Sequence, residues 1–149
     1  MSNPIRSYQD LEAWKLGIGL TKSVYRITGS FPDAERFGLV SQLRRASVSI
    51  PSNIAEGWGR GSTAEYARFL KIARGSLFEI ETQLIIAAEL GFVAEHDRRA
   101  LTDETKQCGR VLSGLLRSIE AKLDRGTQPQ SLIPDPRLQR SDTWVRNRL

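Results

Sequence analysis

The chain has 149 residues, a formal net charge of +5 and one cysteine, Cys108. This length suits a single domain, and a lone cysteine excludes an intrachain disulfide framework. No run of about 18 uninterrupted apolar residues occurs, so we expect no membrane span, and the N-terminal residues do not follow the pattern of a secretory signal. Together these features predict a cytoplasmic protein without a membrane partner.

The first predicted helix runs from about Tyr8 to Thr28. Ser7 and Asp10 have the spacing of a capping box, in which a serine cap is followed three residues later by an acid. Apolar residues then recur at helical spacing, at Leu11, Trp14, Ile18, Val24 and Tyr25. Gly29 and Pro32 end the helix, because glycine tolerates the C-terminal cap and proline cannot continue the helix.

The second predicted helix begins near Asp33 or Ala34 and ends near Gly57. Its buried face follows spacings of four and three residues, through Leu39, Leu43, Ala46, Ile50 and Ile54. Pro51 lies inside this pattern, where its ring would clash with the carbonyl of Ser47 and its missing N–H removes one helical hydrogen bond. Since the apolar register continues on both sides, we predict one continuous helix with a kink at Pro51.

Three glycines at alternate positions, Gly57, Gly59 and Gly61, raise the question of a phosphate-binding loop. Such a loop would need a preceding strand, and a lysine followed by serine or threonine after its last glycine. Here a helix precedes the glycines, and Ser62-Thr63 follows them without a lysine. We therefore interpret the segment as a corner between two helices, with Gly57 as the left-handed cap of the second helix.

The third predicted helix starts at Thr63, after a second capping box made by Ser62 and Glu65, and closes at Gly91. Its apolar residues alternate spacings of four and three, the seam of helices that pack at a shallow angle: Tyr66, Leu70, Ala73, Leu77, Ile80, Leu84 and Ala87. Gly75 lies in the middle of the helix at a cost of about 1 kcal/mol relative to alanine. We expect a neighbouring backbone to approach closely there.

The fourth predicted helix extends from about Glu95 to Asp124 and is capped by Gly126. It repeats the seam, with Leu101, Thr105, Cys108, Leu112, Leu115, Ile119 and Leu123. The four amphipathic helices with short connections predict an all-α fold, an up-down-up-down antiparallel four-helix bundle over residues 1–126. Residues 127–149 contain three prolines among polar residues, which predicts an extended or disordered C-terminal tail.

The residue types of a catalytic or metal site are sparse. A bundle di-metal site needs inward glutamates and Glu-x-x-His pairs, but the one histidine, His96, lies at the start of the fourth helix without such a partner. Cys108 occupies a seam position, where it should be a small buried apolar residue rather than a nucleophile. We therefore predict no catalytic residue, no metal and no cofactor, and keep a hydrolase or metal enzyme only as a remaining alternative.

Two kinds of surface residue carry the functional hypotheses. The basic residues on the second and third helices and the loop between them would bind phosphate backbones with little sequence preference: Arg44, Arg45, Arg60, Arg68, Lys71 and Arg74. Each could equally be an ordinary solvated charge. Phe78, Ile85 and Ile86 fall outside the core stripe of the third helix, which predicts burial against another copy of the chain or, alternatively, under neighbouring loops.

Three stretches carry a resemblance to a known family: "LEAWKLG", "FPDAERFGLVSQLRRASVSIPSNIAEGWGR" and "FLKIARGSLFEIETQLIIAAELGF". They resemble a bacterial four-helix-bundle family that includes the proteins encoded by intervening sequences of 23S ribosomal RNA genes. That family is related to the accessory variability protein of diversity-generating retroelements. The match spans roughly residues 8 to 120, and the chain past about residue 125 departs from the usual pattern.

This resemblance implies an antiparallel bundle that assembles into a barrel-like homopentamer without enzymatic activity. For the retroelement relatives it also implies a basic surface that binds nucleic acid and a reverse transcriptase. The motif residues that carry over have no established chemical role in the family: Ser49, Pro51, Asn53, Glu56 and Gly57. We expect Asn53 and Glu56 to serve capping and packing near the kink, including the carbonyls that Pro51 frees.

Two functions follow as competing hypotheses. The first is a non-catalytic oligomer that binds RNA or DNA backbones as an accessory of a larger nucleoprotein. The second is a protein-interaction scaffold without nucleic-acid binding, whose partner docks on the oligomer or on the tail. Binding that weakens with salt would favour the first, whereas a protein partner retained after nuclease treatment would favour the second.

Overall fold

A computed structural model describes residues 3–132 of the chain. Two short 3-10 helices and four α-helices follow one another in the order η1 (Tyr8–Asp10), α1 (Glu12–Thr28), η2 (Asp33–Glu35), α2 (Leu39–Gly59), α3 (Thr63–Glu89) and α4 (Glu95–Leu132). These residues include no β-strand. The predicted all-α class is confirmed for this part of the chain.

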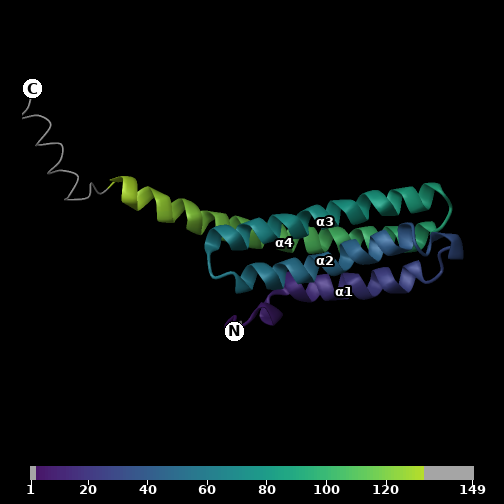
Figure 1. The fold of residues 1–149 in the computed structure, drawn as a ribbon, viewed down its shortest axis with the longest axis horizontal. Helices are drawn as coiled ribbons and strands as arrows, with labels where there is room; N and C mark the ends of the chain where they lie inside the picture. Colours follow the sequence, from purple (N-terminus) through teal and green to yellow (C-terminus); the bar gives the residue numbers. More distant parts are fainter. Residues whose placement is uncertain (1–2, 133–149) are drawn as a thin grey trace, which may run out of the picture.

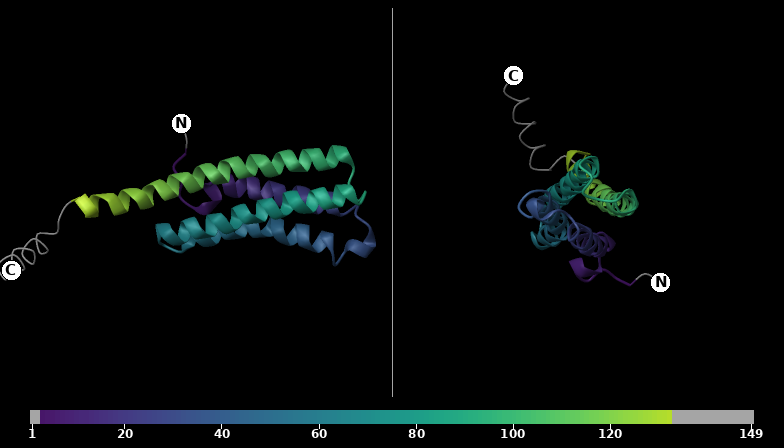
Figure 2. Two further views of the ribbon diagram at one scale, coloured as in Figure 1. Left: turned by 90° about the horizontal axis from the view of Figure 1, so that it is seen from above. Right: turned by 90° about the vertical axis from the view of Figure 1, so that its right-hand side faces the viewer.

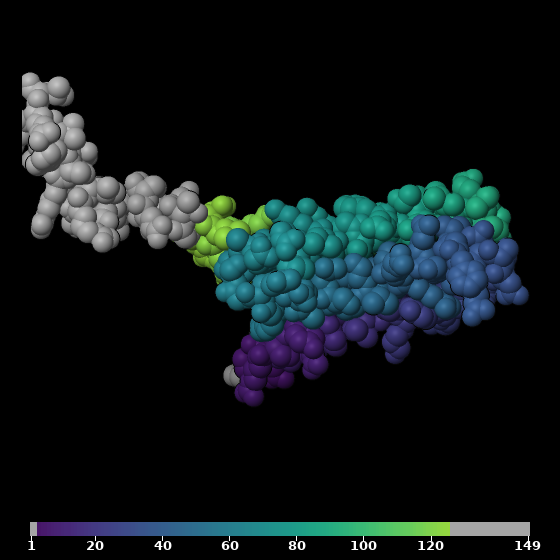
Figure 3. All heavy atoms as spheres, viewed as in Figure 1, coloured from purple at the N-terminus to yellow at the C-terminus, as the bar shows by residue number. Residues whose placement is uncertain are grey.

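The four α-helices run up, down, up and down as an antiparallel bundle (Figure 1). Each helix packs against the next one along the chain, and α4 closes the bundle by packing against α1. The end-on view shows the helices bundled together (Figure 2), and their buried side chains form one core. The space-filling view shows α3 beside α2, with α1 along the other edge of this face (Figure 3). No described helix is long and apolar enough to cross a membrane.

The predicted seam of α3 is confirmed, since all seven of its residues are buried. In α4 the seam is displaced by one position near its middle, where Leu116 is buried and Leu115 only half-buried. In α1 the predicted Ile18 and Tyr25 are exposed. Small and aliphatic residues form the buried face of α1 instead, among them Ala13, Gly17, Leu20 and Val24. The prediction placed the buried face of α1 by its large apolar residues and was therefore partly wrong. The small residues lie on that face because they let α2 pack closely against α1.

Pro51 is buried within α2, which continues through it as predicted. The proline removes the N–H that would bond to the carbonyl of Ser47, four residues earlier. The hydroxyl of Thr21 on α1 lies 3.0 Å from that freed carbonyl oxygen and 2.8 Å from the carbonyl oxygen of Gly17. A Cβ at Gly17 would lie only 3.3 Å from the Pro51 ring. Proline, glycine and threonine together thus join α1 to α2.

The corner between α2 and α3 uses its glycines differently from the prediction. Gly57 is a buried helical residue rather than the left-handed cap, and a Cβ there would lie 2.8 Å from Cβ of Phe69. Gly61 has the positive φ, 77°, that lets the chain turn. The Ser62 side chain then accepts a hydrogen bond from the amide of Glu65, which confirms the predicted start of α3.

Glycine also ends α3, as predicted. Gly91 has a φ of 76°, and its amide donates to the carbonyl of Ala88 while the Phe92 amide donates to Ala87. This pair of bonds is the Schellman motif, which satisfies carbonyls that the helix end leaves open. The close approach predicted at Gly75 is not found within the described chain, because a Cβ there would have no neighbouring atom within 4 Å.

Three helix boundaries differ from the predictions. The capping box of Ser7 and Asp10 is present, but it starts the short η1, and α1 begins only at Glu12. The carboxylate of Glu35 accepts a hydrogen bond from the backbone amide of Leu39 at 3.0 Å, and α2 starts at Leu39 rather than near Asp33. At the other end α4 passes through Gly126 and ends at Leu132. A glycine inside a helix costs only about 1 kcal/mol and does not by itself stop it. Residues 133–149 of the predicted tail lie outside the described residues.

The bond between Thr21 and the freed carbonyl can be tested by a double-mutant cycle. We expect Thr21→Val to lower the free energy of unfolding by about 1–3 kcal/mol, because it leaves a carbonyl of Ser47 without a donor. In a Pro51→Ala background the backbone N–H of residue 51 can bond to the Ser47 carbonyl. The stability lost through Thr21→Val should therefore be smaller by about 1 kcal/mol in that background. Urea denaturation measures both values. The exposed Thr82→Val is the matched control, with an expected change below about 0.5 kcal/mol, and equal losses in both backgrounds would contradict the assignment.

A pair of glycine substitutions tests the corner. We expect Gly57→Ala to destabilise the protein by about 1–2 kcal/mol, since overpacking against Phe69 outweighs the gain in helix propensity. Gly75→Ala meets no atom of its own chain within 4 Å, so thermal and urea denaturation should show a gain of up to about 1 kcal/mol if no other copy of the chain covers this position. A loss of stability in Gly75→Ala would instead show that this glycine faces another copy of the chain.

Candidate nucleic-acid interface

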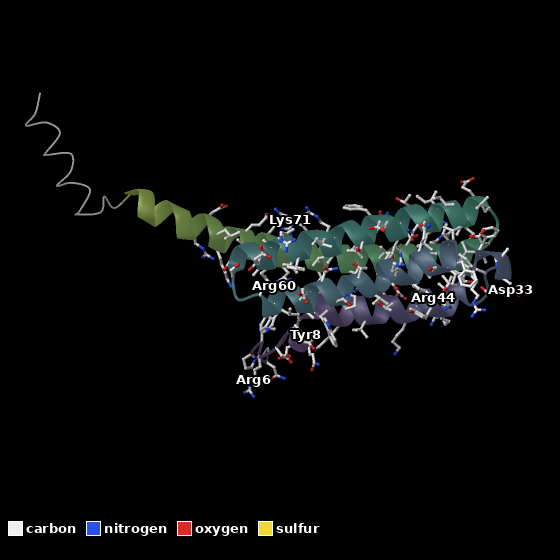
Figure 4. The ribbon with its side chains drawn as sticks, in the orientation of Figure 1. Arg6, Tyr8, Asp33, Arg44, Arg60 and Lys71 are labelled. Carbon is white, nitrogen blue, oxygen red and sulfur yellow. The ribbon has the colours of Figure 1, made fainter. Side chains whose placement is uncertain are left out.

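The six basic residues predicted to bind nucleic acid do not form one surface. Arg44 lies toward the end of the bundle that holds Asp33, whereas Arg60 and Lys71 lie toward the opposite end (Figure 4). Their side chains also differ in what they contact. Four of the six side chains already make hydrogen bonds or ion pairs within the chain, and the other two, Arg45 and Arg74, make neither within its described part.

Arg44 is engaged by the end of α1. Its guanidinium donates to the hydroxyl of Thr28 at 3.0 Å and to the carbonyl of Tyr25 at 3.3 Å, and it lies 4.5 Å from the centre of the Tyr25 ring. A cation at a helix C-terminus is favourable because the carbonyls there carry partial negative charge. Arg44 therefore holds α1 and α2 together, while the exposed Arg45 beside it has no ion-pair partner among the described residues.

Arg60 and Arg68 converge on one buried ring. Their guanidinium carbons lie 4.8 and 4.6 Å from the centre of Phe69. Arg60 pairs with Glu56 at 2.8 Å, and Arg68 pairs with Glu65 at 3.0 Å. The hydrogen bond from Arg68 lowers the pKa of the Glu65 carboxyl, so this acid keeps its charge. These two arginines stabilise the corner between α2 and α3.

Lys71 is also paired, by a contact that crosses between helices. Its ammonium group on α3 lies 3.3 Å from the carboxylate of Glu120 on α4. Arg74, one turn further along α3, has no such partner and lines a groove between α3 and α4. Of the six predicted residues, Arg74 is the one that lines the basic groove between these two helices.

This groove encloses about 480 Å³ and lies between the facing sides of α3 and α4. Its lining consists of Arg74, Leu77, Phe78, Glu81, Thr105, Lys106, Gly109, Arg110, Ser113 and Arg117. Four cations and one carboxylate therefore surround a partly apolar floor. We call these ten residues the α3/α4 groove.

The cations of the groove are free of ion pairs. Among the described residues, no carboxylate oxygen lies within 4.0 Å of the charged nitrogens of Arg74, Lys106, Arg110 or Arg117. The basic residues elsewhere on α3, by contrast, are matched with glutamates. The α3/α4 groove thus keeps a local excess of positive charge that an anionic ligand could neutralise.

Sequence reasoning missed three of these cations, which all lie on α4. Lys106, Arg110 and Arg117 share one face with Ser113, at spacings of four, three and four residues. This is the same helical periodicity that located the core. A search for polar stripes as well as apolar ones would have found the face, but not that it lies opposite Arg74.

The predicted interface residues are exposed in the single chain. Phe78, Ile85 and Ile86 are 61%, 56% and 43% exposed. Phe78 lines the α3/α4 groove, whereas Ile72, 42% exposed, is a further apolar residue of α3 that the prediction omitted. Their burial by another copy stays a prediction.

Among the family motif residues, Ser49 contacts α3, whereas Asn53 and Glu56 bond within α2 and its C-cap. The hydroxyl of Ser49 on α2 lies 2.8 Å from that of Ser76 on α3, and the amide of Asn53 donates to the Ser49 carbonyl at 2.7 Å. Glu56 pairs with Arg60. Asn53 thus bonds a carbonyl near the kink, as expected, but the expectation for the Ser47 carbonyl that Pro51 frees is wrong, since Thr21 bonds it.

The residues considered for catalysis lie apart from one another. Burial raises the pKa of the Cys108 thiol to about 11, so it is a neutral core group at physiological pH. His96 lies on the surface beside Asp97, at 3.4 Å. The described residues contain no cluster of three or more histidine, cysteine or acidic side chains that could hold a metal ion.

Comparisons with known proteins agree with this architecture. A crystal structure of a protein of unknown function from the S23 ribosomal protein family of Bacteroides thetaiotaomicron is similar, with a TM-score of 0.66 and 16% sequence identity. The similarity covers 70% of this chain and 95% of that one, and at this identity it supports the fold alone. No curated protein matches the sequence. The family described as 23S rRNA-intervening sequence protein matches residues 9–114, so the chain belongs to that family.

Proposed function

We propose that this protein binds the phosphate backbone of RNA or DNA in its α3/α4 groove, as a non-catalytic accessory of a nucleoprotein. The observation that carries the proposal is the set of four unpaired cations around one concavity. A polyanion that neutralises them releases its condensed counterions, which favours binding without sequence preference. The family description, 23S rRNA-intervening sequence protein, also names an RNA.

The groove suits a backbone ligand better than four of the other five predicted basic positions do, and the fifth, Arg45, is outside the groove and likewise has no ion-pair partner among the described residues. Arg60, Arg68 and Lys71 would have to give up glutamate partners before they could contact a phosphate. Arg44 would have to leave the carbonyl at the end of α1. Arg74, by contrast, has no carboxylate to leave, so a phosphate bound in the groove meets no such competition.

We also propose that the protein is a homo-oligomer, and the family resemblance implies a pentamer. Ile72 and Ile86 support this proposal, because both are large apolar residues that α3 leaves more than 40% exposed. Fourteen residues separate them, so they lie on one side of the helix about 21 Å apart. Several copies would also multiply the groove charges around one assembly, which strengthens binding to a long polyanion.

Salt-dependent binding tests the nucleic-acid proposal. A labelled 20-nucleotide RNA, single-stranded or annealed to its complement, should bind at 50 mM salt and lose about 50- to 150-fold in affinity by 200 mM, as four phosphate contacts predict. The Arg110→Gln/Arg117→Gln double variant should reduce the slope of log K against log salt by about 1.5. Fluorescence anisotropy gives both quantities.

The control for that experiment is a second double variant with the same loss of charge. Lys22→Gln/Arg26→Gln removes two cations from α1, which lines no part of the groove. We expect its salt slope to stay close to that of the wild type. Absence of binding to both the single-stranded and the duplex RNA at 50 mM salt, or equal slopes for the two double variants, would refute the proposal.

Light scattering tests the oligomer. We expect the wild-type mass to be a multiple of the 16.7 kDa chain. Ile72→Glu/Ile86→Glu should lower it, because buried charges without partners are costly. Ile18→Glu on α1 replaces another exposed isoleucine and should leave the mass unchanged. A wild-type mass of one chain at every concentration would exclude the oligomer.

A further inference from the structure

We infer that the ligand of the α3/α4 groove is a single-stranded nucleic acid, one base of which stacks on the ring of Phe78. This inference rests on the proposed function and makes it more specific. It assigns a role to an exposed aromatic side chain within the basic groove. Proteins that bind single strands combine such rings with cations along the backbone path.

Phe78 has a free aromatic face. The other exposed aromatic residues within residues 3–132 already have a ring or cation partner: Tyr25 with Arg44, Phe37 with Arg36, and Trp58 with Tyr66. Among the described residues no ring and no cation stacks on Phe78, although its side chain is 61% exposed. Its face is therefore open to a planar group from outside the chain.

The residues around Phe78 leave space for a base. Gly109 and Ser113 are the small residues of α4 that line the groove. A Cβ at Gly109 would meet only the side chain of Leu77, at the ordinary contact distance of 3.7 Å. An apolar floor next to an open ring favours a base, whose faces are apolar and whose edges are polar. The cations at the rim would then lie near the phosphates on either side.

The cations on α4 suit a flexible strand. Arg110 follows Lys106 by about 6 Å along the helix axis, and Arg117 follows Arg110 by about 10.5 Å, from a rise of 1.5 Å per residue. An unpaired strand can bend to bring successive phosphates to these points while one base turns inward. A duplex would have to unstack a base first, at a cost of a few kcal/mol.

The same charges argue against a copy of this chain as the occupant of the groove. A symmetric contact centred on Phe78 would bring four cations of one copy toward four cations of the other, with one carboxylate each from Glu81. Like charges at such a contact oppose association. Phe78 is thus better placed for a polyanion, whereas Ile72 and Ile86 remain available for self-association.

The test compares RNA forms and Phe78 variants of the full chain. Binding of a labelled 12-nucleotide single-stranded RNA, the same DNA sequence and the RNA duplex is measured by anisotropy at 100 mM salt. We expect both single strands to bind at least fivefold more tightly than the duplex. Phe78→Leu, which stays apolar but loses the ring, should weaken single-strand binding about 5- to 100-fold, and Phe78→Trp should retain it.

Phe37→Leu is the matched control, since it removes another highly exposed ring outside the groove. It should change single-strand affinity less than twofold. Duplex binding as tight as single-strand binding, or an unchanged affinity in Phe78→Leu, would overturn the inference while leaving salt-dependent backbone binding intact. Absence of binding to every probe would instead overturn the proposed function itself. Circular dichroism of Phe78→Leu establishes that the bundle is folded.

Discussion

The arrangement of the bundle depends on how α1 meets α2 at Pro51. A proline inside a helix leaves one carbonyl without its donor, and a buried carbonyl without a donor is costly. Here the Thr21 hydroxyl lies 3.0 Å from that carbonyl oxygen, and Gly17 makes room for the proline ring. The missing hydrogen bond of α2 is thus replaced by a donor on α1, and this contact joins the two helices at one register.

The basic residues of the surface divide according to whether they serve the fold or remain free. Arg44 completes the end of α1, and Arg60 and Arg68 pack on Phe69 while pairing with glutamates. The α3/α4 groove, by contrast, gathers cations from both of its helices without a carboxylate partner. A net charge of +5 therefore says little by itself, because its distribution between paired and unpaired groups decides what the surface can bind.

Periodicity in the sequence was sufficient for the four-helix architecture, although not for the buried face of α1 or for the candidate site. The apolar seam of α3 located the core because a buried stripe recurs at every turn, and Ser62 located the start of α3, whereas Ser7 caps the short η1 rather than α1. Gly57 was misread because glycine serves both helix caps and close packing, and sequence alone does not distinguish them. The groove was missed because Arg74 and Arg110 belong to different helices, and only their packing brings them to one concavity.

Because Cys108 is buried, the rate at which its thiol is modified can report how often the core opens. It is the one cysteine of the chain, it lies fully inside the bundle, and its thiol has a pKa of about 11. A thiol-modifying reagent can therefore reach it only when the bundle opens transiently, so the alkylation rate reports the population of the open form. The native sequence thus contains its own probe of local unfolding, and ligands that clamp α3 to α4 would slow the modification.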